Sequence, residues 1–227
     1  MRKALIDGDI FTYRAAWACN DETEAEAIKA FDSLVTDAIL DSGCEDYQVF
    51  LTGRGNFRYD IAKTAVYKGN RKDVAPPVHK DAIRKHAMDV WDAVMSVDEE
   101  ADDTISIEAT KLGVMNCVIV SIDKDFLQVP GLHYNPVKKV KTTMDYWSGT
   151  MFFYQQILMG DKADNIVGIK GIGPAKSHAI LNGAETELEL YERCLKQYNG
   201  DEARVIENAR LLWLRREVGQ IWEPPTC

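Results

Sequence analysis

The spacing of apolar positions changes along the chain and predicts strands and helices in alternation. Between residues 24 and 40 the apolar side chains recur every three to four positions, which is the spacing of one helix face, whereas short apolar runs that end at glycine or aspartate are typical of buried strands. The predicted strands lie at 3–6, 47–51 and 117–122, with further short strands between 131 and 144. The predicted helices lie at 24–40, 80–95, 101–112, 151–159, 174–182, 186–198 and 202–217.

Strands that alternate with helices and then give way to helices alone predict an α/β domain with a smaller helical domain attached. The β-branched run before Asp123 suits a buried parallel strand, so the central sheet should be mostly parallel and flanked by helices. We place the α/β domain at 1–147 and the helical domain at 148–227, although no flexible, linker-like segment marks the boundary.

The charge is unevenly distributed. The net charge of −9 argues against a simple nucleic-acid-binding protein. Residues 54–85, however, carry nine Lys or Arg against three acidic residues, and residues 98–103 carry five acidic residues in six positions. Both segments could be solvated faces. Alternatively, the cations hold a polyanion and the carboxylates hold the metal ions that cleave it.

Cysteine usage and hydropathy indicate the compartment. The five cysteines are odd in number and widely spaced, which argues against a disulfide framework or a zinc site. No signal peptide and no apolar stretch of membrane-spanning length is evident. We therefore expect a soluble, cytoplasmic protein with no membrane partner.

Acidic side chains occur at points that a parallel α/β fold can bring together. Asp7 and Asp123 follow strands, and ligands bind beyond the carboxyl ends of parallel strands. Pairs of carboxylates three residues apart on a helix share a face. Together these groups would repel one another without a cation, and their oxygens favour two Mg²⁺ or Mn²⁺ ions. The candidate ligands are Asp7, Glu100, Asp102, Asp103, Asp123, Asp125, Asp161 and Asp164.

Each acidic motif taken alone has a simpler interpretation. A short Asp-x-Asp pattern is usually a turn or a cap, and acidic residues favour helix N-termini. The metal-site hypothesis therefore depends on all four acidic groups occurring in an order that lets them converge. These groups are Asp7, the run at 100–103, the pair Asp123 and Asp125, and the pair Asp161 and Asp164.

A glycine-rich turn precedes a predicted helix in the C-terminal third. Gly168, Gly171 and Gly173 are followed by Pro174 at the favoured first position of a helix. Backbone N–H groups at such a turn form an anion site, and Lys170 and Lys176 add positive charge. This helix–hairpin–helix element predicts binding to the DNA backbone without sequence readout. A plain helix–turn–helix is the alternative.

These motifs resemble those of the 5′-nuclease family, which comprises flap endonucleases, the 5′-nuclease domain of bacterial DNA polymerase I and phage 5′–3′ exonucleases. Residues 5–9 (LIDGD) resemble its first motif, and 67–71 (YKGNR) resemble its arch-base motif. Residues 100–103 (EADD), 121–126 (SIDKDF) and 160–176 are similar to the remaining motifs. The small size and the Arg-rich helix at 204–216 look most like the compact phage enzymes.

The resemblance implies a PIN-like nuclease domain with a helical arch at 67–92 and a helix–hairpin–helix subdomain. Asp7, Glu100, Asp102 and Asp103 would then hold one metal, Asp161 and Asp164 a second, and Asp123 and Asp125 would lie between them. Lys68 and Arg71 would act on the scissile phosphate, Tyr67 would stack on a base, and Arg14 would touch a phosphate or brace the site. The hairpin at 168–173 would bind the duplex, with a potassium ion at the hairpin as a further cofactor. The implied DNA contacts are Gly168, Lys170, Gly171, Gly173, Lys176 and Lys72.

The implied activity is two-metal hydrolysis of duplex or flapped DNA at 5′ ends, giving 5′-phosphates, with RNA–DNA hybrids as further substrates. The implied role is phage DNA replication, recombination or host DNA degradation. One departure is Leu51-Thr52-Gly53, where the family often has an Asp, and it bears on the affinity for metal. The alternatives are a PIN-like ribonuclease and a non-catalytic DNA-binding module.

Overall fold

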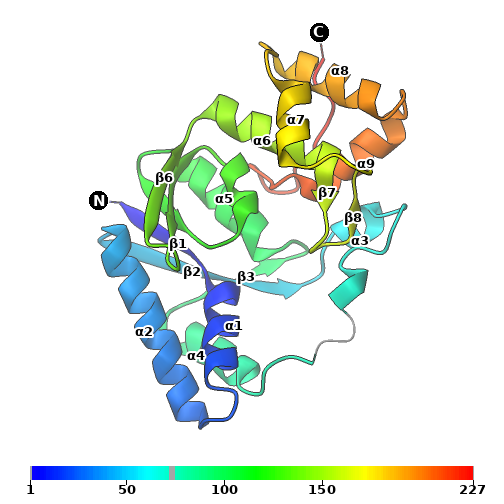
Figure 1. The fold of residues 1–227 in the computed structure, drawn as a ribbon. Coiled ribbons are helices and arrows are strands. Elements are labelled where there is room, and N and C mark those ends of the chain that lie inside the picture. The colour runs from blue at the N-terminus through cyan, green and yellow to red at the C-terminus, as the bar shows by residue number, and fades with distance from the viewer. Residues whose placement is uncertain (1, 72–74, 227) are drawn as a thin grey trace. The chain divides into compact units, whose positions relative to one another are not determined.

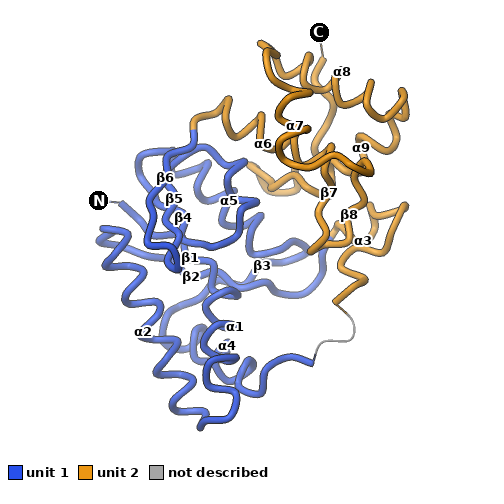
Figure 2. Tube along the Cα trace, in the orientation of Figure 1, with its two compact units in different colours: residues 1–56, 75–144 blue, residues 57–74, 145–227 orange. Residues whose placement is uncertain are grey.

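The computed structural model describes residues 2–71 and 75–226, which form two compact units. Unit 1 comprises Met1–Asn56 and Ala75–Met144, and unit 2 comprises Phe57–Val74 and Asp145–Cys227 (Figure 2). Each unit has its own hydrophobic core. Within the described part of the chain, no helix is both long and apolar enough to cross a membrane.

Unit 1 is built on a six-stranded sheet in the order β3-β2-β1-β4-β5-β6. All neighbouring strands are parallel except β5 and β6, which form an antiparallel pair. This confirms the mostly parallel sheet predicted from the sequence. The strands are β1 (Lys3–Asp7), β2 (Asp46–Arg54), β3 (Val94–Val97), β4 (Cys117–Val120), β5 (Gly131–Asn135) and β6 (Val140–Met144).

Helices cover both faces of this sheet, as parallel strands require. Figure 1 shows α1, α2 and α4 on one side and α5 on the other. In β1 the residues alternate accordingly: Ala4 and Ile6 join the core beneath α1 and α2, whereas Leu5 between them points to the opposite face. The helices are α1 (Gly8–Ala18), α2 (Glu24–Ser42), α4 (Lys80–Val90) and α5 (Ala101–Leu112).

The helix predicted at 80–95 ends at Val90, and the residues after it form the edge strand β3. Ile83 and Ala87 of α4 are fully buried in the core of unit 1. Helix α4 makes up the helical part of the predicted arch at 67–92. Because its apolar face is buried in the core, α4 is a packed helix of unit 1. The rest of that segment includes residues 72–74, which lie outside the described residues.

Unit 2 is mainly helical, as predicted, and its core contains Phe153, Tyr154, Leu181, Leu190 and Trp222. The long helix α6 starts earlier than predicted because Asp145 caps it, accepting a hydrogen bond from the Ser148 N–H at 2.8 Å. Unit 2 contains α3 (Arg58–Ile61), α6 (Tyr146–Met159), β7 (Gly160–Asp161), β8 (Ile166–Val167), α7 (Pro174–Leu181), α8 (Glu187–Gln197) and α9 (Glu202–Leu212).

Residues 57–71 belong to unit 2, which differs from the division at 147 expected from the sequence. Arg58 is almost fully buried and donates to the carbonyl oxygens of Leu211 at 2.9 Å and Trp213 at 2.8 Å. The Glu207 carboxylate accepts hydrogen bonds from the backbone N–H groups of Lys63 and Thr64 at 2.8 and 2.7 Å. Side chains of α9 and its C-terminal end thus fix a segment that lies some 150 residues earlier in the chain.

Candidate active site

A buried carboxylate ends the central strand of unit 1. Asp7 is 3% exposed, caps α1 and accepts a hydrogen bond from the Ser121 hydroxyl at 2.8 Å. The pKa of Asp7 is raised to about 7, chiefly by burial and also by the negative charges of Asp9 and Asp123, against the lowering effect of the hydrogen bonds from Ser121 and Ile10. A carboxylate in such surroundings favours the approach of a cation.

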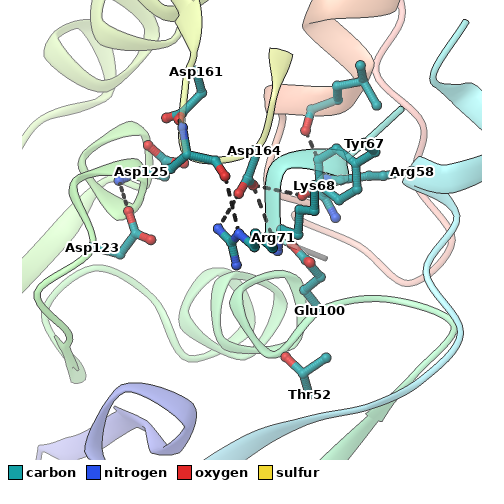
Figure 3. A network of polar contacts seen from close by, with 12 residues as sticks. Thr52, Arg58, Tyr67, Lys68, Arg71, Glu100, Asp123, Asp125, Asp161 and Asp164 are labelled. Atoms are coloured by element: carbon teal, nitrogen blue, oxygen red, sulfur yellow. Dashed lines mark hydrogen bonds and ion pairs between the residues drawn. The ribbon is translucent and has the colours of Figure 1, made fainter. Parts of the chain in front are cut away.

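The loop after β4 lies beside Asp7. Ser121 connects the two, because its hydroxyl donates to Asp7 and accepts from the Asp123 N–H at 3.0 Å. Asp123 in turn accepts from the Asp125 N–H at 2.9 Å (Figure 3). Parallel pairing of β1 with β4 brings these strand ends to one edge of the sheet, as the sequence predicted.

The acidic run 98–103 starts α5. Glu100 is the N-cap residue, and it forms a capping box with Asp103, whose carboxylate accepts from the Glu100 N–H at 3.2 Å. Asp103 is fully buried, while Asp102 is half-buried. Glu100 and Asp103 therefore cap the N-terminus of a helix, as the simpler interpretation of this acidic run predicts. Carboxylates are stable there because of the helix dipole.

Thr52 and Asp9 are held by an arginine that the sequence did not single out. Arg84 of α4 donates to the Asp9 carboxylate and to the Thr52 carbonyl oxygen, and the Thr52 N–H donates to Asp9 at 2.8 Å. The Thr52 hydroxyl accepts from the Ala101 N–H at 3.0 Å, at the start of α5. This network joins the ends of β1 and β2 to the helix that carries Glu100. No spacing rule could have found it, because Arg84 lies 75 residues from Asp9.

In unit 2, Asp164 is the centre of a second polar cluster. The Tyr67 hydroxyl donates to its carboxylate at 2.9 Å, the Lys68 ammonium lies 3.8 Å from the same oxygen, and Arg71 donates to the other oxygen. Figure 3 shows all three side chains directed at Asp164. Asp161 is buried and accepts from the Ala163 N–H at 2.6 Å. Segments 67–71 and 161–164, which the sequence analysis assigned to the phosphate and to the second metal respectively, are thus in direct contact.

Tyr67 does not offer the exposed ring that base stacking needs. Its side chain is 3% exposed, it belongs to the core of unit 2, and its hydroxyl is bonded to Asp164. The exposed neighbour is Tyr59, which is 57% exposed and stands edge-on to Tyr67 with ring centroids 5.6 Å apart. Aromatic residues that serve as stacking platforms need a free face, so the prediction for Tyr67 does not fit this conformation.

The glycine-rich turn at 168–173 lies directly before α7. Gly171 has φ +81, and a side chain there would meet nothing within 4 Å, so the glycine is required by backbone conformation. A Cβ at Gly168 would lie 2.1–2.3 Å from the backbone of Met159 and Gly160, so this glycine serves close packing. Gly173 is the N-cap of α7, and Pro174 follows it. Lys170 and Lys176 are exposed, as contact with a polyanion requires.

Two further predicted residues complete the set. Arg14 lies half-buried on α1, and Lys72 lies outside the described residues.

Among residues 2–71 and 75–226, no three His, Cys, Asp or Glu side chains converge closely enough to hold a metal ion. The carboxylates are instead bonded to backbone N–H groups and to Arg84, Lys68 and Arg71. Their all-oxygen donor set still fits a hard divalent cation, which would have to displace some of these partners.

This fold and these motifs define a class of nuclease-type proteins with a resolvase-like α/β domain. The chain belongs to the 5′–3′ exonuclease family: the model described as "5'-3' exonuclease, N-terminal resolvase-like domain" matches residues 2–152. It is 28% identical over 159 residues to flap endonuclease Xni of Shewanella piezotolerans, covering 64% of this chain and 62% of that protein. The match to DNA polymerase I of Caldicellulosiruptor bescii is 25% identical over 223 residues, covering 85% of this chain and 25% of the polymerase.

Solved structures show the same fold. The T5 5′-exonuclease with bound zinc ions has a TM-score of 0.71 at 18% identity, covering 93% of this chain and 89% of that one. The bacteriophage T5 flap endonuclease, in a pseudo-enzyme-product complex with DNA and metal ions, has a TM-score of 0.70 at 16% identity, with the same coverage. The expected likeness to a phage-type 5′-nuclease is therefore confirmed at the level of family and fold.

Proposed function

We propose that this protein is a divalent-metal-dependent 5′–3′ exonuclease and 5′ flap endonuclease that hydrolyses DNA to 5′-phosphate products. The observation that carries the proposal is the network of Asp7, Ser121 and Asp123 at the carboxyl edge of the sheet, in a chain that belongs to the 5′–3′ exonuclease family. The relatives named flap endonuclease and the DNA-bound T5 structure support a DNA substrate. A cytoplasmic location, or the host cytoplasm for a phage enzyme, is part of the same proposal.

The proposed metal ligands fall into one set in each unit. In unit 1, Asp7 and the acidic residues of α5 and of the loop after β4 would hold Mg²⁺ or Mn²⁺. In unit 2, Asp161 and Asp164 would hold a second ion. Two such ions supply an activated water and stabilise the leaving oxygen. The unit 1 ligands are Asp7, Glu100, Asp102, Asp103, Asp123 and Asp125.

The basic residues would bind and polarise the DNA. Lys68 and Arg71 present an ammonium and a guanidinium group to a phosphate, and fixed donors of this kind stabilise negative charge that develops in the transition state. Arg14 would touch a phosphate of the same strand. The exposed hairpin, with Lys170 and Lys176, would hold the duplex backbone without reading bases, with a potassium ion as a further ligand.

A single assay separates this proposal from its alternatives. End-labelled duplex DNA, flapped DNA, RNA–DNA hybrid and single-stranded RNA are incubated with Mg²⁺, with Mn²⁺ or with EDTA. We expect metal-dependent release of 5′-phosphorylated products from the DNA substrates. Cleavage of the RNA alone would favour the PIN-like ribonuclease. Binding of DNA with no cleavage under any condition would favour the non-catalytic module.

The first metal site of unit 1 can be tested at Thr52. Thr52→Asp should lower the Mg²⁺ concentration for half-maximal cleavage by about threefold to tenfold, because it adds a carboxylate at the strand end beside Asp7. The new carboxylate can still accept from the Ala101 N–H, as the Thr52 hydroxyl does. The measurement is a Mg²⁺ titration of cleavage, and Thr52→Asn is the neutral control of matched shape.

The same titration separates this explanation from a compensating role for Asp9. The Asp9 carboxylate is bonded to Arg84 and to the Thr52 N–H, so Asp9→Asn should move the Mg²⁺ midpoint little. A sharp rise of the midpoint in Asp9→Asn, with no effect of Thr52→Asp, would show that Asp9 is itself the ligand that replaces the missing acid.

A further inference from the structure

Asp164 is ion-paired with the two basic residues that the proposed mechanism assigns to the phosphate. We infer that Lys68 and Arg71 are built-in counter-ions of Asp164, and that a divalent cation at Asp164 and a DNA phosphate on the two basic side chains displace this pairing together. Metal binding and DNA binding would then be coupled through one carboxylate. The inference rests on the proposed function and adds a regulatory contact to it.

Both carboxylate oxygens of Asp164 are engaged. One accepts from the Tyr67 hydroxyl at 2.9 Å and lies 3.8 Å from the Lys68 ammonium, and the other accepts from Arg71. A metal ion that binds Asp164 needs the same oxygen lone pairs. It would also be repelled by the two positive charges as long as they remain in place. Metal and basic side chains therefore compete for Asp164.

The backbone around the pair is shaped for this contact. Lys68 has φ +53, which is strained for a residue other than glycine, and its N–H donates to the Asp164 carbonyl oxygen at 2.9 Å. Asn70 donates to the Lys162 carbonyl oxygen at 2.8 Å, and Arg71 Nε donates to that of Ala163 at 3.2 Å. The bonds from the Lys68 N–H and from Asn70 do not involve the two basic side chains, so they hold the two loops together when the ionic contacts are exchanged.

The Arg71 side of this pairing is exposed enough to exchange its partner. The Arg71 side chain is 54% exposed, whereas those of Lys68 and Asp164 are 19% and 17% exposed. Ion pairs of an exposed side chain such as Arg71 are weak, and a DNA phosphate offers a guanidinium the same kind of paired, charged acceptors as a carboxylate does. If metal binding frees the basic side chains for phosphate, then phosphate must free Asp164 for metal to the same degree.

The test measures Mn²⁺ binding to the whole chain by electron paramagnetic resonance, without DNA. Lys68→Met combined with Arg71→Gln should bind Mn²⁺ about threefold to tenfold more tightly than the wild type, because two competing cations are removed. Arg71→Lys, combined with wild-type Lys68, should keep the wild-type affinity. Lys196→Met, at an exposed residue of α8, changes the net charge of unit 2 in the same direction and should have no effect.

A purely structural ion pair would not give this pattern. The gain in Mn²⁺ affinity should vanish when the same substitutions are made in an Asp164→Asn background, since the competition is for that carboxylate. Unchanged or weaker Mn²⁺ binding in the variant lacking both basic residues, with wild-type circular dichroism, would overturn the inference. If the wild type cleaves DNA with Mn²⁺ in that case, the proposed function stands; a wild type that neither binds Mn²⁺ nor cleaves DNA contradicts both.

The reverse direction of the coupling is measured in EDTA, where no cleavage can occur. Asp164→Asn should bind a fluorescent duplex about threefold to tenfold more tightly, because a negative charge that pairs with Lys68 and Arg71 and competes with phosphate for them is removed. The gain should disappear when both basic residues are also substituted. Glu192→Gln, at an exposed acid of α8, is the charge-matched control and should leave the affinity unchanged. A gain of equal size in this control would mean that net charge alone is responsible.

Discussion

Replacing Asp161 and Asp164 together by asparagine is expected to slow DNA cleavage by roughly a hundredfold or more, because the proposed second metal contributes several kcal/mol of charge stabilisation. Duplex binding in EDTA should be no weaker than that of the wild type. Asparagine keeps the shape of both side chains and an oxygen that can accept from the Ala163 N–H, so the loop can fold as before. Only the negative charge that a cation would bind is lost.

Single-turnover cleavage at saturating protein and fluorescence anisotropy in EDTA distinguish the chemical step from binding. Glu185→Gln with Glu192→Gln removes the same charge from exposed positions of unit 2 and should leave both quantities near wild type. A large loss of duplex binding without metal would identify Asp161 and Asp164 as structural residues, and full cleavage activity would remove them from the proposed site.

Arg58→Met is expected to lower the free energy of unfolding by about 3 kcal/mol, the largest effect on stability that we anticipate. The guanidinium is 1% exposed and donates to the carbonyl oxygens of Leu211 and Trp213, at the C-terminal end of α9. Carbonyl groups at a helix C-terminus lack partners within the helix, and a cation there is favoured by the dipole. Methionine would fill much of the volume but leave both buried acceptors unsatisfied.

Urea unfolding followed by circular dichroism measures this effect, and Arg58→Lys serves as the matched variant. Lysine keeps the charge but lacks the planar fork that reaches two acceptors, so it should recover only part of the lost stability. If Arg58→Met unfolds at the wild-type urea concentration, the two hydrogen bonds do not anchor the segment 57–71.

Patterns within the sequence predicted what depends on nearby residues. The apolar run at 117–122 predicts a strand that is buried on both faces, because such a strand needs no alternation of apolar and polar residues. The strand β4 lies within this run. The turn before Pro174 gave the start of α7 because proline favours the first helical position. The carboxylates at the ends of β1 and β4 followed from the geometry of parallel strands.

Features that depend on distant partners were missed. The helix predicted at 80–95 overlaps the edge strand β3. Val94, Met95 and Val97 of this strand are exposed, so its sequence lacks the alternation of apolar and polar residues that indicates a strand. The contact between Arg84 and Asp9 and the burial of Tyr67 arise from tertiary packing that no local spacing encodes. For the same reason, nothing in residues 57–71 indicates that they pack on α9.

The anchoring of residues 57–71 by α9 also sets an order of events during synthesis. The segment that carries Lys68 leaves the ribosome well before Leu211 and Trp213, which supply the acceptors for Arg58. Until then its guanidinium lacks these two acceptors, so this loop can settle only after α9 has been synthesised. A stop codon between residues 177 and 210 would spare every residue proposed to act on DNA and yet leave Lys68 on an unanchored loop. Because such a stop also removes core residues of unit 2 such as Leu212 and Trp222, these nonsense variants should lose activity through failure of that unit to fold, without the loss of any reacting group.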